Sequence, residues 1–164
     1  MTLTTHALIA AAAASPLAAS HPAFIFLAAL ASHYIADAIP HWDYKLHSLV
    51  ENEDIAKKNI IFTRATFWLD LLRSALDALL GLAIVTLLVW PSGFEELLFI
   101  VLVVVGGILP DFLQGLHYGL GLNFLKPHQR FHDWVHARIR LNLYPRLGVP
   151  LQLVLMIAAL IILV

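Results

Sequence analysis

Histidine and aspartate side chains recur four residues apart in two segments of this chain. The two series are His33, Asp37 and His41, followed later in the chain by His128, His132 and His136. Residues four apart lie on one face of an α-helix, so each series would present its polar side chains in one direction. Imidazole nitrogen and carboxylate oxygen, without sulfur, are donors that suit Zn²⁺ and related divalent ions.

Further candidate ligands stand near the ends of long apolar segments. At 1.5 Å per residue, His33 and Asp70 lie roughly 10 Å and 8 Å inside their segments, which is a similar depth. A charged group that faces lipid at such a depth costs several kcal/mol, so we expect these groups to face one another. We predict a metal site with ligands drawn from seven residues: His6, His33, Asp37, His41, Asp70, Asp111 and His132.

The composition places these residues in a membrane-embedded chain. Of the 164 residues, 60% are hydrophobic and 13% are charged, whereas a soluble domain carries about 25% charged residues. The chain has no Cys, which excludes disulfides and thiolate ligands. Residues 1–20 carry no Lys or Arg before their apolar run, so we expect a retained helix there and not a signal peptide.

Five apolar helices are expected, separated by turns and by two polar segments. The helices are predicted over residues 5–19, 23–39, 65–90, 94–109 and 149–164. The segment 41–64 has the composition of a solvated loop, and within 111–146 the stretch 128–143 has the pattern of an amphipathic interfacial helix. The predicted fold class is therefore all-α: one membrane-embedded domain over residues 1–164, with about five short transmembrane helices and one amphipathic helix.

The distribution of positive charge indicates an orientation. If the five helices alternate in direction, every Lys and Arg falls on the side of the N-terminus or in the first turns of a helix leaving that side. The positive-inside rule makes this side cytoplasmic. We therefore predict a multi-pass protein of the inner or plasma membrane with a cytoplasmic N-terminus and an amphipathic helix on the cytoplasmic side.

Several short motifs resemble those of the YdjM-like inner-membrane proteins, a family of membrane-bound metal-dependent hydrolases. The run Ser32-His33-Tyr34-Ile35-Ala36-Asp37-Ala38-Ile39-Pro40-His41 resembles that family's sHxxxDaxxPH element. Leu109-Pro110-Asp111 is similar to its lPDiDH element, His128-Gln129-Arg130-Phe131-His132 to its HRGxTH element, and Thr5-His6 also fits. The second acid and the His of the lPDiDH element are absent after Asp111, and the order of the first two elements is reversed.

A fainter likeness exists to zinc-dependent phospholipase C and related nucleases. The run His33-Tyr34-Ile35-Ala36-Asp37 is similar to the start of their HYxGDxxxPxH-like helix, although the spacing to His41 is shorter here. This likeness implies a multi-metal phosphoester site on an all-helical scaffold.

These observations lead us to expect a metal-dependent hydrolase that acts on an ester or phosphoester at the cytoplasmic interface. The cofactor would be one or two divalent ions, Zn²⁺ foremost, with Mn²⁺ or Fe²⁺ as alternatives. His128 and His136 are the candidate general acid and base, and Arg130 could bind a phosphate or carboxylate group of the substrate. The position of the site favours an amphiphilic, lipid-like substrate and membrane lipids as partners.

Other interpretations remain open at the level of sequence. The protein could be a non-catalytic metal-binding or scaffold protein, or part of a small divalent-ion or proton transporter with Asp70 and Asp77 along the path. Asp70, Arg73 and Asp77 could instead form a buried ion-pair network. The Lys and Arg residues of 126–146 are explained by topology and anionic lipid, so no nucleic-acid partner is expected. The oligomeric state and the substrate are left open.

Overall fold

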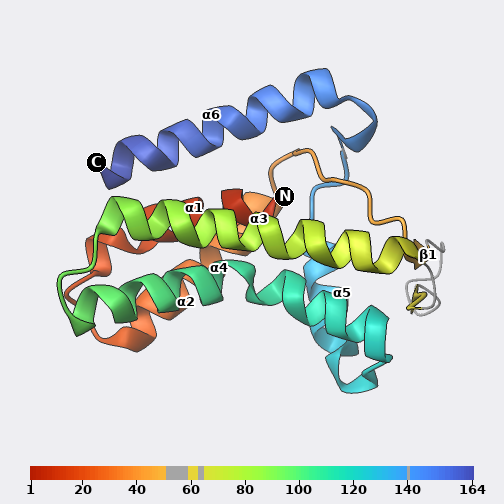
Figure 1. Cartoon of the computed structure of the whole chain (residues 1–164), viewed down its shortest axis with the longest axis horizontal. Helices are drawn as coiled ribbons and strands as arrows, with labels where there is room; N and C mark the ends of the chain where they lie inside the picture. Colours follow the sequence, from red (N-terminus) through yellow and green to blue (C-terminus); the bar gives the residue numbers. More distant parts are fainter. Residues whose placement is uncertain (51–58, 63–64, 140) are drawn as a thin grey trace.

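The structure, a computed structural model, describes residues 1–50, 59–62, 65–139 and 141–164, and its regular elements are mainly helical (Figure 1). A short antiparallel pairing joins β1 (Leu49–Val50) to β2 (Asn59–Ile60). Short 3₁₀ helices are η1 (Ser15–Leu17), η3 (Asn123–Leu125) and η4 (Leu141–Leu143). The α-helices of the described ranges are α1 (Leu3–Ala14), α2 (Pro22–Asp37), α3 (Ala65–Val89), α4 (Phe94–Leu120), α5 (Lys126–Val135) and α6 (Pro145–Leu163).

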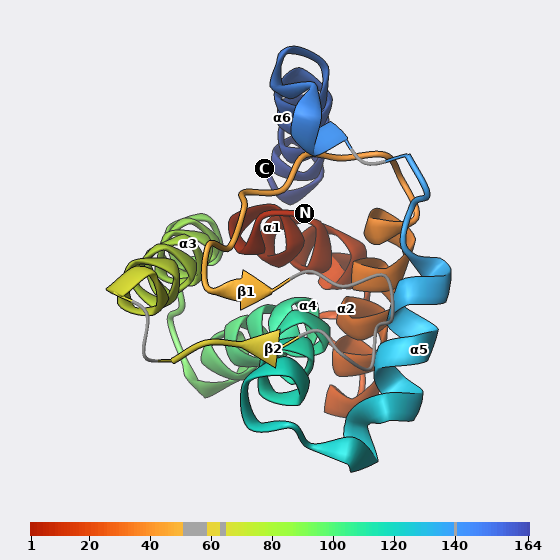
Figure 2. The same cartoon turned by 90° about the vertical axis from the view of Figure 1, so that its right-hand side faces the viewer.

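Helix α1 lies at the centre of the bundle, with α2, α3, α4 and α6 packed around it (Figure 2). Its residues Ala7, Ala10, Ala11 and Ala14 are completely buried. Small side chains let neighbouring helix backbones approach closely, which is the main source of helix association in lipid, where apolar side chains gain little from leaving the solvent. The alanine-rich run of α1 is therefore the core on which the other helices pack.

A pair of glycines brings α4 into close contact with α1 and α2. A Cβ atom at Gly107 would lie 2.8 Å from the Cβ of Ala10 in α1, and one at Gly106 would lie 2.8 Å from the Cβ of Ala29 in α2. Both separations are shorter than a normal carbon–carbon contact, so no larger residue fits without moving a helix. This close packing brings Asp111, one turn further along α4, to the ends of α1 and α2.

Three helices are long and apolar enough to cross a membrane: α3, α4 and α6. The other two apolar helices, α1 with 12 residues and α2 with 16, extend about 18 Å and 24 Å, less than the roughly 30 Å of a hydrocarbon core. The prediction of an all-α fold is therefore confirmed, with three helices that could span a membrane by length and composition, whereas five separate spans are not established. Exposed leucines and isoleucines, among them Leu72, Leu79, Leu87, Ile157 and Ile161, cover the outer faces of α3 and α6.

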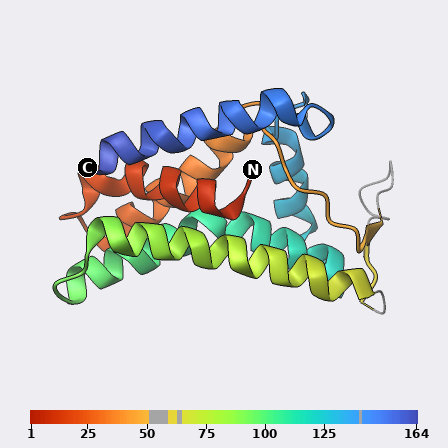
Figure 3. The ribbon, with the colours of Figure 1, turned by 45° about the horizontal axis from the view of Figure 1, so that its top comes forward.

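Successive apolar helices alternate in direction, as Figures 1 and 3 show. One end of the bundle carries the paired strands, the start of α3 and α5, and we call it the α5 end. The N-terminus lies further in, where the first residues of α1 bond to Asp77 near the middle of α3 (Figure 1). The opposite end carries the turn between α1 and α2, the turn between α3 and α4, and the C-terminus. Because α5 and the segments beside it contain most of the described basic residues, the charge asymmetry expected from the sequence corresponds to a real asymmetry of the bundle.

Helix α4 continues eleven residues beyond its predicted end at residue 109, through Pro110 to Leu120. Pro110 has no N–H to donate to the carbonyl of Gly106, so a helix end was expected there. Close packing of Gly106 and Gly107 against two helices holds the backbone in a helical path, and neighbouring helices commonly support proline in this way inside membranes. The helix ends instead at Gly121, whose φ of 64° is left-handed.

The predicted amphipathic helix over 128–143 is shorter and lies earlier than expected. Helix α5 begins at Lys126 and ends at Val135, because His136 adopts an extended backbone with φ −59° and ψ 136°. Beyond this point the chain bonds to the end of α2 and the loop that follows it: the N–H of Ala137 donates to the carbonyl of Asp37 at 2.8 Å, and that of Leu141 to the carbonyl of His41 at 3.1 Å. These tertiary bonds replace the helical bonds that sequence periodicity predicted.

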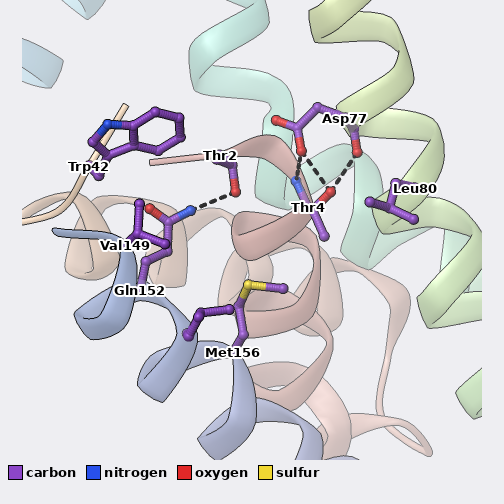
Figure 4. Close-up of a pocket in the computed structure, with 9 residues that line it drawn as sticks. Thr2, Thr4, Trp42, Asp77, Leu80, Val149, Gln152 and Met156 are labelled. Atoms are coloured by element: carbon purple, nitrogen blue, oxygen red, sulfur yellow. Dashed lines mark hydrogen bonds between the residues drawn. The ribbon is translucent and has the colours of Figure 1, made fainter. Parts of the chain in front are cut away.

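The start of α1 is fixed by side chains from two neighbouring helices (Figure 4). The Asp77 carboxylate of α3 accepts hydrogen bonds from the backbone N–H groups of Leu3 and Thr4, at 2.6 Å and 3.0 Å. A carboxylate at a helix N-terminus satisfies free N–H groups and the helix dipole. Thr2 is the N-cap residue, and its hydroxyl oxygen accepts from the backbone N–H of Thr5. Asp77 therefore has a structural role, which removes its depth as an argument for a transport path.

Helix α6 contacts the bundle mainly through α1. Its buried Gln152 donates from Nε2 to Thr2 Oγ1 at 2.7 Å and to Thr5 Oγ1 at 2.8 Å. Next to these bonds, a cavity of about 230 Å³ lies between α1, α3 and α6, with Trp42 and Met156 in its lining (Figure 4). The one polar residue expected in this helix thus ties it to the core.

The glycine packing predicts a specific stability effect. Gly107→Ala would place a methyl group against Ala10 and force α4 away from α1, so we expect the free energy of unfolding to fall by about 1–3 kcal/mol. The matched control is Gly115→Ala in the same helix, where a Cβ meets nothing within 4 Å and a small gain is expected. Thermal unfolding of both variants in detergent micelles measures the difference, and equal stabilities would contradict the packing described here.

Candidate metal centre

Asp37, the last residue of α2, is the residue on which the candidate site converges. Its carboxylate is 1% exposed. Oδ2 lies 3.2 Å from Nε2 of His33 and 3.1 Å from Nε2 of His132. Oδ1 lies 3.2 Å from Nε2 of His6 and 3.6 Å from Nε2 of His41. One buried carboxylate thus faces four imidazoles, which come from α1, α2, α5 and the loop after α2.

Four residues, His33, Asp37, Asp111 and His132, bring one donor atom each within 4.8 Å of all the others, and we call them the first ligand group. The Nε2 atoms of His33 and His132 are 3.2 Å apart, and both are close to Asp37 Oδ2. Donor atoms bound tetrahedrally to zinc at 2.0–2.1 Å lie about 3.3 Å from one another. Three of the four donors therefore have the spacing of zinc ligands, and Asp111 Oδ1 stands further off, at 3.7–3.9 Å from the two imidazoles.

Three helices position the first ligand group. His33 and Asp37 lie four residues apart on α2, so both point to the same side. Asp111 is supplied by the part of α4 that continues beyond Pro110, and His132 by the buried face of α5. The bond from the Ala137 N–H to the Asp37 carbonyl holds the end of α5 against the end of α2.

Hydrogen bonds on the far side of the rings orient the imidazoles. Nδ1 of His33 lies 2.7 Å from the carbonyl oxygen of Gly107. A carbonyl can only accept, so Nδ1 carries the proton and Nε2 of the neutral ring has a free lone pair directed at the site. The amide of Gln114 lies 3.2 Å from Nδ1 of His132 and can serve that ring in the same way when its oxygen faces it.

A second set of donors adjoins the first and shares Asp37 with it. Asp37, His41 and His136 bring donor atoms within 4.8 Å of one another, and we call these three the second ligand group. Asp43 borders this group: its Oδ2 lies 3.3 Å from Nε2 of His41 and 3.9 Å from Nε2 of His136. The two imidazole rings are tilted against each other with their centroids 4.8 Å apart.

Asp43 is strongly held in its ionised form. Burial alone would raise the pKa of this carboxyl, but the interactions with His41 and with the N-terminal ammonium of Met1 outweigh burial and keep the pKa well below its usual range. The Met1 nitrogen lies 2.5 Å from Asp43 Oδ1 and 3.4 Å from Asp37 Oδ1. The site therefore contains a carboxylate that stays negatively charged at neutral pH.

Several buried polar atoms of this site lack a well-directed hydrogen bond. Nε2 of His6, Nε2 of His41 and Oδ2 of Asp37 are in this state. Such atoms cost about 1–3 kcal/mol each when they stay unsatisfied, and a lone pair facing a carboxylate oxygen at about 3 Å is repulsive unless a proton or cation lies between them. A divalent cation would satisfy them together, so the donor set fits a metal ion.

The structure brings six of the seven predicted ligands together: His6, His33, Asp37, His41, Asp111 and His132. His6 stacks on His33 with the ring centroids 4.0 Å apart, which places it beside both ligand groups. Asp70 lies elsewhere. Its Oδ2 accepts from the backbone N–H and the hydroxyl of Ser48, at 2.7 Å and 2.8 Å, and so fixes the chain before β1. Asp70 and His33 were predicted at a similar depth in their helices, but a similar depth did not mean that both side chains face the same site.

The three residues expected to take part in catalysis occupy different positions. His136 belongs to the second ligand group. His128 lies one turn before His132, with its Nε2 3.1 Å from the hydroxyl oxygen of Tyr34. Burial, together with the nearby His132 and His33, lowers the pKa of His128. Arg130 is exposed on α5.

Three residues of the site are not among the seven predicted ligands: Asp43, Gln114 and His136, the last of which was predicted as a general acid or base. Asp43 follows His41 by two residues, so its proximity to a predicted ligand was a usable signal. Gln114 is placed beside the site only because α4 continues through Pro110. Since proline was expected to end that helix, the sequence offered no reason to place Gln114 near His132.

Comparisons of the chain with protein families, with curated proteins and with solved structures find no match. The resemblance to the YdjM-like proteins therefore stays a prediction, and the interpretation of the site depends on its geometry.

The first ligand group predicts stabilisation by metal. With Zn²⁺ at 100 times its dissociation constant, we expect the free energy of unfolding to rise by about 2.7 kcal/mol, and Asp37→Asn to abolish this rise. Asp70→Asn is the matched control, because it neutralises a buried carboxylate outside both ligand groups and should keep the full effect. Thermal unfolding in micelles, with and without Zn²⁺ after chelator treatment, is the measurement. Equal responses of the two variants would rule out Asp37 as the centre of the site.

Proposed function

We propose that this protein is a membrane-embedded, metal-dependent hydrolase that cleaves an ester or phosphoester bond of an amphiphilic substrate at the α5 end. The observation that carries this proposal is the first ligand group, which has three closely spaced buried donors and one more distant, partly exposed carboxylate. Catalytic zinc sites have this general form, with three protein ligands and one position left open for water or substrate.

The open side of the site is the side of Asp111. Its side chain is 23% exposed, whereas those of His33, Asp37 and His132 are at most 2% exposed. Asp43, at the edge of the second ligand group, is also partly exposed at 28%. Water and substrate therefore have access to the site past Asp111 and Asp43. The imidazoles of His33 and His132 lie behind these carboxylates and are shielded from solvent.

A divalent ion held by the first ligand group would supply Lewis-acid chemistry, polarising the bond to be cleaved and lowering the pKa of a coordinated water toward neutrality. The residues of the chain would supply the remaining functions. Asp111 is placed to orient a water molecule and accept its proton. His128, outside both ligand groups and hydrogen-bonded to Tyr34, is the imidazole available to protonate a leaving group. Exposed Arg130 can contact an anionic part of the substrate.

The distribution of side chains on helix α5 supports an amphiphilic substrate. A surface helix of a soluble protein buries apolar side chains, whereas α5 buries polar side chains and exposes aromatic ones. Its Gln129 and His132 are buried, whereas Phe131 is 46% exposed and Trp134 is 79% exposed. A helix that turns polar residues inward and aromatic residues outward suits an interfacial position among lipid head groups. The metal ligand His132 would then lie just beneath the surface at which lipid head groups are found.

The basic residues at the α5 end support a location for the protein and a class of partner. We assign the protein to a cell membrane with the α5 end on the cytoplasmic side, because Lys45, Lys126, Arg138 and Arg146 flank the helices at that end. Lipids are its expected partners. A cytoplasmic site would be tested by cysteine accessibility: a Cys introduced at exposed Arg138 should be labelled only from the inner face of the membrane.

Hydrolysis can be tested directly with chromogenic substrates. We expect Zn²⁺- or Mn²⁺-loaded protein in micelles to hydrolyse p-nitrophenyl phosphate, bis-p-nitrophenyl phosphate or p-nitrophenyl butyrate. His132→Ala should lower the rate at least about 100-fold, because losing a ligand removes several kcal/mol of transition-state stabilisation. Asp70→Asn should retain the rate. Stoichiometric metal without hydrolysis of any of these esters would favour a non-catalytic metal-binding protein.

The exposed aromatic residues of α5 predict a selective effect on lipid-like substrates. The double change Phe131→Ser and Trp134→Ser should raise KM for a phospholipid in mixed micelles several-fold, while kcat/KM for a soluble ester stays the same. Phe94→Ser is the matched control at the opposite end of the bundle, where Phe94 is 75% exposed. A loss of similar size in the control, or with the soluble ester, would mean that the aromatic residues do not contact substrate.

A further inference from the structure

The Asp37 carboxylate divides its two oxygens between separate sets of imidazoles. Oδ2 faces His33 and His132, the imidazoles of the first ligand group. Oδ1 points to the other side, where Nε2 of His41 lies at 3.6 Å and Nε2 of His6 at 3.2 Å. A carboxylate whose two oxygens face two donor sets has the arrangement of a bridging ligand.

The imidazoles of the second ligand group have the same tautomer as His33. Nδ1 of His41 donates to the carbonyl of Ile39 at 2.7 Å, and Nδ1 of His136 donates to the carbonyl of Ala137 at 3.3 Å. Because a carbonyl cannot donate, Nε2 of each neutral ring has a free lone pair. These Nε2 atoms are the ones directed at Asp37 and Asp43.

His41 is the observation that most needs an explanation. Its side chain is 2% exposed, and its Nε2 is among the buried atoms without a well-directed hydrogen bond. The atom lies between two carboxylates, 3.6 Å from Asp37 Oδ1 and 3.3 Å from Asp43 Oδ2. A lone pair held between two anionic oxygens is repulsive unless a proton or a metal cation lies between them, and one imidazole nitrogen with two carboxylate oxygens is a donor set that suits a divalent ion.

We propose that the second ligand group holds a second divalent ion, so that the protein has a dinuclear centre bridged by Asp37. The second ion would be bound by Asp37 Oδ1, His41 and His136, with Asp43 at its accessible edge. Each ligand group then has one partly exposed carboxylate of its own: Asp111 belongs to the first group, and Asp43 borders the second. This proposal rests on the proposed function, in which a metal ion is bound by the first ligand group.

A dinuclear centre would narrow the substrate class. Two divalent ions about 3.5–4 Å apart are typical of enzymes that hydrolyse phosphoesters, because both ions can stabilise the negative charge that develops on phosphoryl oxygens. The two partly exposed carboxylates would let water reach either ion. We therefore assign the substrate to the phosphoesters, in preference to the carboxylic esters.

Metal stoichiometry tests the proposal independently of activity. After loading with Zn²⁺ and removal of free metal, elemental analysis should give about two ions per wild-type chain. His41→Ala and Asp43→Asn should each leave about one ion, and Asp37→Asn should leave none. His117→Ala is the matched control and should keep two ions, because His117 is buried at 8% exposure and bonds to the carbonyl of Leu122, outside both groups.

Electron paramagnetic resonance of the Mn²⁺-loaded wild-type protein gives a second measurement that needs no variant. Two Mn²⁺ ions bridged by a carboxylate should give a spin-coupled spectrum, and a single ion should give an isolated six-line spectrum. One ion per wild-type chain, unchanged in His41→Ala and lost in His132→Ala, would overturn the second position and leave the proposed hydrolase intact. Absence of bound metal from correctly folded wild-type protein would overturn both proposals.

Discussion

The arrangement of this molecule depends on one constraint: a carboxylate, Asp37, lies 1% exposed in an apolar helical bundle and must be compensated for its lost hydration. Four imidazoles converge on it, from helices far apart in the chain. They can approach only because the helices pack closely, through the alanines of α1 and the Gly106–Gly107 step of α4. The small residues of the core therefore serve the site as much as they serve stability.

The site and the outer surface of the protein are linked through α5. This short helix separates the polar centre of the bundle from its surroundings, with Gln129 and His132 on one face and Phe131 and Trp134 on the other. Its end is held against the end of α2 by backbone bonds, among them that from Ala137 to Asp37. A helix that carries His132 on its buried face and aromatic side chains on its outer face brings the polar centre close to the surface of the protein.

Spacing of four residues was the most informative feature of the sequence. It placed His33 and Asp37 on one face of α2, and it grouped His128, His132 and His136 as a second series. Depth was a weaker guide, because it says how far along a helix a residue lies but not which neighbour it faces. Asp70 was placed at a depth similar to that of His33, yet it bonds to Ser48.

The parts that could not be predicted depend on tertiary contacts. Local rules end a helix near Pro110 and continue one through His136, and packing reverses both outcomes. The consequence for the site is considerable, since the continuation of α4 supplies Gln114 and the break after Val135 directs the chain back to α2. The helical class and the apolar segments followed from composition and periodicity, whereas the side chains that support the ligands required the three-dimensional arrangement.

The bonds from Ala137 to Asp37 and from Leu141 to His41 also bear on how the protein is made. The donors of the centre are spread from residue 6 to residue 136, so the first helices enter the membrane long before α5 leaves the ribosome. Until α5 arrives, Asp37 faces only His6, His33 and His41, and the imidazoles of His132 and His136 are missing from the site. Completion of the site is therefore a late event in biosynthesis, because it requires the carboxy-terminal third of the chain to have docked correctly.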